Sequence, residues 1–142
     1  MNPLVIISCG AKKQSTACQA MDMYVGSYFK AALRFAMATT DISNIRILSA
    51  KYGLIKATDI IEPYEMRISD WRAAKPSKVI QQAKDLGDYG RTDVLVVAGK
   101  DYNFIIRSAF PLSKNVVAHG KGLGYQMQIL KSLTDAAKSK GV

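Results

Sequence analysis

The side chains best suited to chemistry are one imidazole and a small group of carboxylates. His119 is the only histidine of the chain, and it directly follows an apolar run. Because an imidazole titrates near neutral pH and can pass a proton to a departing group, we expect a catalytic role for His119. A negative charge near it is expected from Asp22 or Asp101, although each is also suited to the first turn of a helix. Glu62 and Glu65 are further candidates, and the residue types leave the choice among the four open.

Small, polar and basic residues follow each of four apolar runs. The lysines in these segments are Lys12, Lys13, Lys51, Lys100 and Lys121. Like charges gathered on one rim repel each other and cost stability unless an anion offsets them. The lysines therefore favour a nucleic acid or a nucleotide as the partner.

The segment after the first apolar run begins with Ser8, Cys9 and Gly10. Gly10 allows a ligand to approach the backbone closely, and Cys9 is suited either to nucleophilic attack or to simple burial. Tyr52 or Tyr64 could stack on a base. Neither the phosphate-loop motif nor the dinucleotide-binding fingerprint is present in the sequence, so hydrolysis of nucleoside triphosphates is not expected.

Four apolar runs are expected to form buried strands, at residues 4–7, 45–48, 94–97 and 116–118. The stretches with helical spacing between and after them are 28–38, 71–86, 101–110 and 125–138. Alternating strands and helices indicate parallel pairing, because only helical crossovers join parallel neighbours. The sequence predicts an α/β fold: one three-layer domain over residues 1–142, with a four-stranded, mainly parallel sheet flanked by helices. In such a sheet the carboxyl ends of the strands share one edge, where open α/β folds bind ligands.

The composition narrows the classes of function. Lysine and arginine number 20 against 11 aspartates and glutamates, which gives a net charge of +9 and favours a polyanionic partner. The apolar runs are far shorter than the roughly 20 residues that span a bilayer, and the N-terminus lacks the order of a secretion signal. We therefore expect a cytoplasmic protein without membrane contact, of open oligomeric state. Two cysteines and one histidine leave little for a metal site, and no cofactor is expected.

Several segments resemble a family of small bacterial and phage proteins of undefined function. These segments are residues 8–13, 22–29, 48–55 and 61–65. More distantly, residues 51–65 are similar to the YaaA peroxide-stress proteins, which bind DNA. The Tyr-Gly-Leu and Pro-Tyr elements of that region are the most specific, and the resemblance implies a link to nucleic acid.

A second resemblance implies a reaction. The uracil-DNA glycosylase superfamily has a four-stranded parallel sheet with its site at the strand ends, and its last strand leads into the loop His-Pro-Ser-Pro-Leu-Ser. Here the fourth expected strand leads into residues 119–124, which keep histidine and leucine at the same spacing but carry glycine in place of proline. The resemblance implies that His119 faces a base flipped out of the DNA and that Leu123 enters the vacated stack.

These features favour a DNA glycosylase that hydrolyses the N-glycosidic bond of a flipped, modified or damaged base and leaves an abasic site, with defence against phages carrying modified DNA as a conceivable role. The residues expected to contact the DNA or the base are Ser8, Cys9, Gly10, Lys12, Lys13, Lys51, Tyr52, Tyr64, Glu65, Lys121 and Leu123. Two alternatives remain open: a noncatalytic, YaaA-like DNA-binding stress protein, and an enzyme acting on free nucleosides or nucleotides.

Overall fold

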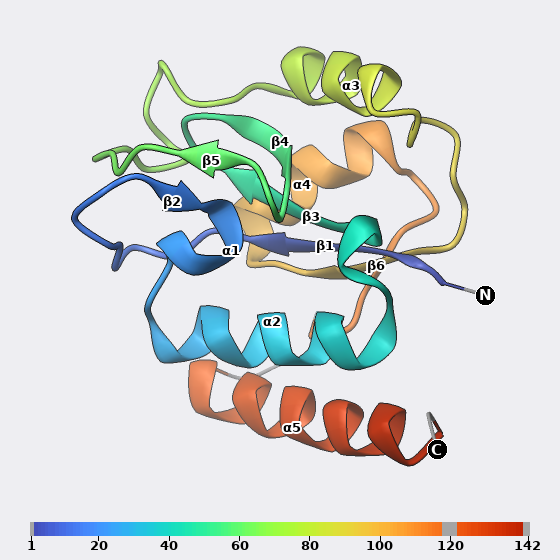
Figure 1. The fold of residues 1–142 in the computed structure, drawn as a ribbon. Coiled ribbons are helices and arrows are strands. Elements are labelled where there is room, and N and C mark those ends of the chain that lie inside the picture. Colours follow the sequence, from blue (N-terminus) through green and yellow to red (C-terminus); the bar gives the residue numbers. More distant parts are fainter. Residues whose placement is uncertain (1, 118–121, 141–142) are drawn as a thin grey trace.

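The computed structural model describes residues 2–117 and 122–140, which form a mixed sheet with helices on both faces (Figure 1). The strands of the sheet are β1 (Leu4–Ser8), β3 (Ile45–Ser49), β4 (Gly53–Lys56), β6 (Val94–Val97) and β7 (Lys114–Asn115). Their spatial order is β4-β3-β1-β6-β7, with β1 at the centre. Strands β3, β1, β6 and β7 run parallel, and β4 is antiparallel to β3.

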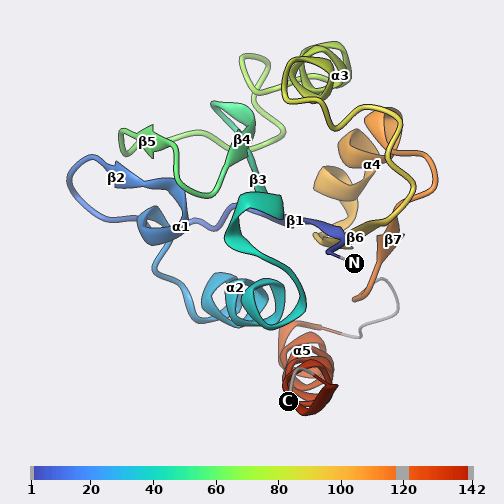
Figure 2. The same cartoon turned by 45° about the vertical axis from the view of Figure 1, so that its right-hand side comes forward.

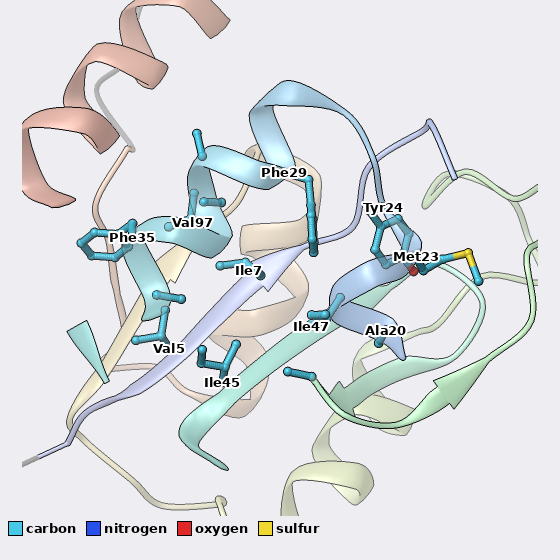
Figure 3. Close-up of a cluster of buried hydrophobic side chains, with 14 of the residues drawn as sticks. Val5, Ile7, Ala20, Met23, Tyr24, Phe29, Phe35, Ile45, Ile47 and Val97 are labelled. Atoms are coloured by element: carbon cyan, nitrogen blue, oxygen red, sulfur yellow. The ribbon is translucent and has the colours of Figure 1, made fainter. Parts of the chain in front are cut away.

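Burial on both faces explains why the central strands are continuously apolar. In β1 the side chains of Val5 and Ile7 pack into one apolar cluster, whereas those of Leu4 and Ile6 pack into a second. The alternation follows from the two-residue period of a strand. Figure 3 shows the first cluster, in which Val5 and Ile7 lie under Phe29 and neighbouring side chains.

Five helices supply the other sides of these clusters: α1 (Ala20–Met23), α2 (Ser27–Thr39), α3 (Pro76–Asp85), α4 (Lys100–Ala109) and α5 (Leu123–Lys140). Helices α1 and α2 cover one face of the sheet, and α3 and α4 cover the other. Helix α5 packs along α2 (Figure 2). None of the described helices is long and apolar enough to cross a membrane.

The remaining elements are short. Strands β2 (Cys18–Gln19) and β5 (Ile60–Ile61) form a small antiparallel ladder beside α1. A 3₁₀ turn over Ile42–Asn44 leads from α2 into β3. The ladder ties the segment after β4 to the segment after β1, so two loops at the carboxyl edge of the sheet are held together.

The α/β class, the parallel pairing and the covering helices are confirmed, but the expected count of four strands is wrong. The fifth strand, β4, turns back on β3 after residues 50–52 and opens with Gly53, whose φ of 79° allows the turn. The expectation of a helix from residue 71 is also wrong, because α3 begins at Pro76. A proline favours the first helical position and forces the residue before it to be extended.

The fourth strand lies earlier than expected. Strand β7 ends at Asn115, and Val116 and Val117 form a turn. Val117 is buried in the first apolar cluster, so its hydrophobicity reflects packing and not strand formation. Ala118, which was expected to complete this strand, lies outside the described residues.

A buried ion pair ties β3 to the segment after α3. Arg46 Nε donates to Asp88 Oδ2 at 2.8 Å, and the two side chains are 7% and 5% exposed. The same guanidinium also donates to the backbone carbonyl oxygens of Ser43 and Ile45. The charge of Arg46 is therefore compensated almost entirely by protein groups.

Removal of one partner should be costly. We expect Asp88→Ala to lower the free energy of unfolding by about 3 to 5 kcal/mol, because it leaves the buried Arg46 charge uncompensated. Asp93→Ala is the matched control, since the Arg91–Asp93 pair is partly exposed and its loss should cost about 0 to 1 kcal/mol. Urea unfolding measures both values, and equal losses would contradict a special role for the buried pair.

Candidate functional site

The loop after β1 starts the site. The backbone N–H of Cys9 donates to the carbonyl of Leu48 at 3.0 Å, which extends the pairing of β1 with β3 by one residue. The loop then folds back, and Lys13 forms a bridge with Tyr24 directly after α1. These bonds hold the residues between Cys9 and Lys13 at the carboxyl edge of the sheet.

A hollow of about 490 Å³ opens at this edge, and we call it the edge pocket. Its volume falls in the range of about 300 to 1,000 Å³ that is typical of small-molecule sites. Three segments form its walls: the loop after β1, the segment after β5 and the first turn of α4. The lining residues are Cys9, Gly10, Ala11, Lys13, Glu65, Met66, Arg67, Ile68, Ser69, Asp101 and Tyr102.

A smaller hollow of about 240 Å³ lies on the other side of the same loop, between residues 8–12 and residues 26–29. Cys9, Gly10 and Ala11 line both hollows and thus form the wall between them. The smaller hollow adjoins the N-terminal end of α2, where backbone N–H groups point outward without helical partners.

Three hydroxyl groups are linked beneath the edge pocket. Ser49 Oγ donates to Tyr64 Oη at 2.8 Å, and Tyr64 Oη lies 2.7 Å from Tyr24 Oη. Ser49 Oγ in turn accepts the backbone N–H groups of Lys51 and Tyr52. Two hydrogen bonds join three hydroxyls, so one phenolic proton, on Tyr24 or on Tyr64, can be donated to a further acceptor.

The tyrosines of this cluster remain protonated at ordinary pH. Burial, followed by the nearby Cys9 sulfur, raises the pKa of Tyr24 to about 12. The same two causes raise the pKa of Tyr64 and of Tyr102. Tyr102 Oη lies 3.2 Å from Cys9 Sγ, so a neutral phenol and a thiol meet at the wall of the edge pocket.

Cations lie against this aromatic cluster. Lys13 Nζ is 4.5 Å from the centre of the Tyr64 ring, and the Tyr52 ring meets Tyr64 edge-on at 5.7 Å between centroids. A cation over an aromatic face is attracted by the ring quadrupole. Lys51 lies over the Tyr52 ring in the same way, at 5.3 Å.

The carboxylates divide into two groups. Asp101 and Glu65 line the edge pocket, together with the cations Lys13 and Arg67. Asp101 lies in the first turn of α4, where the positive end of the helix stabilises a negative charge. Asp22 is exposed on α1 and lines neither hollow. The geometry therefore separates the two carboxylates between which the sequence did not choose.

Other expected site residues take varied positions. Ser8 and Lys12 line the smaller hollow. Tyr52 is half-buried, and its hydroxyl accepts the backbone N–H of Glu62 at 3.2 Å. Leu123 is the first residue of α5, is 64% exposed and lines neither hollow. His119 and Lys121 lie outside the described residues.

Comparison with known proteins identifies a family. A family model described as a family of unknown function, DUF6884, matches residues 4–132. The chain belongs to the DUF6884 family. The match includes every element from β1 to β7 and more than half of α5. No curated protein matches the chain.

Two contributions to the site of this DUF6884 chain were missed from the sequence. Ser49 was treated as part of a loop, although both Ser8 and Ser49 end apolar strands and this shared position was an available signal. The segment at 66–69 has no periodic pattern, so nothing in the sequence placed Arg67 at the pocket. Among residues 2–117 and 122–140, no three histidine, cysteine, aspartate or glutamate side chains gather in a way that could hold a metal ion.

The buried tyrosines predict a loss of stability at high pH. A phenol in the unfolded chain loses its proton near pH 10, whereas Tyr24 in the folded protein keeps its proton up to about pH 12. The unfolded state therefore binds fewer protons above about pH 10, and the stability that is fully present below that pH falls as pH rises toward 12. Urea unfolding at a series of pH values measures this slope.

Tyr24→Phe should make the slope shallower, at the cost of about 1 kcal/mol near neutral pH for the lost hydrogen bond to Tyr64. Tyr89→Phe is the matched control, because Tyr89 is exposed. An unchanged slope in Tyr24→Phe would show that Tyr24 does not carry the effect.

Proposed function

We propose that this chain is a DNA glycosylase that hydrolyses the bond between a modified or damaged base and its deoxyribose. The observation that carries the proposal is the edge pocket, where the Asp101 carboxylate and the neutral Tyr102 phenol share one cavity with Lys13 and Arg67. A carboxylate, a hydrogen-bond donor and cations are the groups that this reaction needs.

In the proposed reaction a water oxygen bonds to C1′ of the sugar as the bond from C1′ to the base nitrogen breaks. The sugar acquires positive charge in the transition state, and Asp101 stabilises that charge electrostatically. The base departs with the bonding electrons and takes up a proton, while the attacking water loses one. His119 is the proposed proton donor on the basis of the sequence, and the Tyr102 hydroxyl is placed to hydrogen-bond the edge of the base. The reaction requires no cofactor.

The partner in this proposal is DNA. The net charge of +9 favours a polyanion, and Lys12 and Lys13 flank the loop that separates the two hollows. The phosphate next to the bound nucleotide would lie near the N-terminal end of α2. A base must leave the helical stack to enter a pocket, and the resemblance to uracil-DNA glycosylases, which have their site at the strand ends of a parallel sheet, supports the same arrangement.

Release of a free base tests the proposal. Purified protein is incubated with a panel of DNAs that includes phage genomes with hypermodified pyrimidines, free bases are identified by mass spectrometry, and abasic sites are revealed by alkaline cleavage. We expect one base to be released in equal number to the abasic sites. Tight binding without release across the whole panel would reject the glycosylase.

The role of Asp101 has its own test. Asp101→Asn keeps the size of the side chain and removes its charge, so we expect base release to slow by about 100- to 1,000-fold while DNA affinity changes little. Asp22→Asn is the matched control, because Asp22 is exposed outside the edge pocket, and it should release the base at the normal rate. Slowing in Asp22→Asn alone would transfer the catalytic charge to α1.

The excess of basic residues also suits a second function, a noncatalytic DNA-binding protein similar to the YaaA proteins. That function predicts binding without base release, with log affinity falling by about 0.9 per phosphate contact for each tenfold rise in salt. Fluorescence titrations at several salt concentrations measure the slope. Turnover of free nucleosides instead of DNA would reject both functions and favour an enzyme acting on monomers.

A further inference from the structure

A second hollow, of about 380 Å³, adjoins the edge pocket between the segment before α3 and the exposed side of α4. The two hollows share Ile68, Ser69 and Asp101, so these residues form the wall between them. In contrast to the edge pocket, the second hollow is mainly apolar. Its other lining residues are Ala74, Lys75, Pro76, Phe104 and Ile105.

Phe104 is the most unusual member of this lining. Its side chain is 72% exposed, although it borders an apolar surface that could have covered it. Phe104 follows Asp101 by three residues on α4, and residues with this spacing lie on the same face of a helix. One helix face therefore presents a carboxylate to the edge pocket and an accessible aromatic ring to the neighbouring hollow.

Basic side chains surround the apolar surface. Lys75 lines the second hollow, and Lys100 directly precedes Asp101 at the start of α4. Arg67 lines the edge pocket on the other side of the shared wall. The segment between β5 and α3 that contributes to both hollows also carries Trp71, which is 82% exposed (Figure 1).

An accessible aromatic ring beside cations is the combination that binds single-stranded nucleic acid, because bases stack on the ring while the cations follow the phosphates. We propose that the second hollow binds the base next to the one held in the edge pocket, stacked on Phe104. This inference rests on the proposed function and adds to it the form of the substrate. Phe104 can reach the face of the neighbouring base only where that base is unstacked, so the substrate is single-stranded or locally melted DNA.

Phe104→Ala tests the stack. We expect the affinity for a mixed-sequence, 12-nucleotide single strand of DNA to fall by about 5- to 150-fold, which is the loss that removal of one base-aromatic stack produces. The affinity for the four deoxynucleoside 5′-monophosphates should stay unchanged, because a monomer occupies the edge pocket alone. Phe104→Trp should restore strand binding, since tryptophan offers a larger stacking surface.

Tyr89→Ala is the matched control for losing an exposed aromatic side chain, because Tyr89 is 52% exposed and follows α3, away from both hollows. It should bind the strand as the unsubstituted protein does. A second measurement locates the base directly: 5-iododeoxyuridine at each position of the strand is crosslinked by ultraviolet light, and the peptide containing Phe104 should carry the crosslink.

The outcomes separate this inference from the glycosylase. Base release together with equal strand binding by Phe104→Ala and the unsubstituted protein overturns the stacking subsite and leaves the glycosylase in place. Loss of strand binding in Phe104→Ala without any base release rejects the glycosylase and retains the subsite. A preference for intact duplex over the single strand overturns the subsite, as does an absence of strand binding.

Discussion

Every other part of the fold follows from the burial of β1 on both of its faces. A strand with Leu4, Val5, Ile6 and Ile7 fully buried has no exposed face on which to carry polar groups. Chemistry can therefore start only where the strand ends, and the loop from Cys9 to Lys13 is the first segment free to do so. Helix crossovers are required on both faces, and they deliver α2 and α4 with their N-terminal ends at that same edge.

The site at this edge has a neutral interior and a charged rim. Tyr24, Tyr64 and Ser49 form a hydrogen-bonded cluster of uncharged hydroxyls, whose burial raises the pKa of both tyrosines and keeps them protonated. Lys13 contacts that cluster through the face of the Tyr64 ring and also lines the edge pocket. The neutral interior can be buried without a counter-ion, whereas the cations remain at the rim, where an anionic ligand can approach.

Asp101 is the residue through which the proposals are connected. It belongs to the edge pocket, where its charge suits the proposed reaction, and also to the wall of the apolar hollow beside it. Phe104 lies one turn further along α4, so a single helix orients a reactive carboxylate and a surface for stacking. Two adjacent hollows of different polarity are suited to two neighbouring nucleotides of one strand, and the cations around them are suited to the phosphates.

The sequence by itself determined the α/β class, the parallel strands and the helices 28–38, 101–110 and 125–138 to within two residues, because periodic burial is a local pattern. It also indicated that the segments after the strands hold the polar groups. Only the tertiary structure separated Asp101 and Glu65 from Asp22, brought Arg67 to the pocket and joined Ser49 to Tyr64. Those relations depend on how irregular segments cross the sheet edge, and such paths are set by contacts between residues far apart in the chain. The added strand β4 has the same cause, since its four residues become a strand only by pairing with β3.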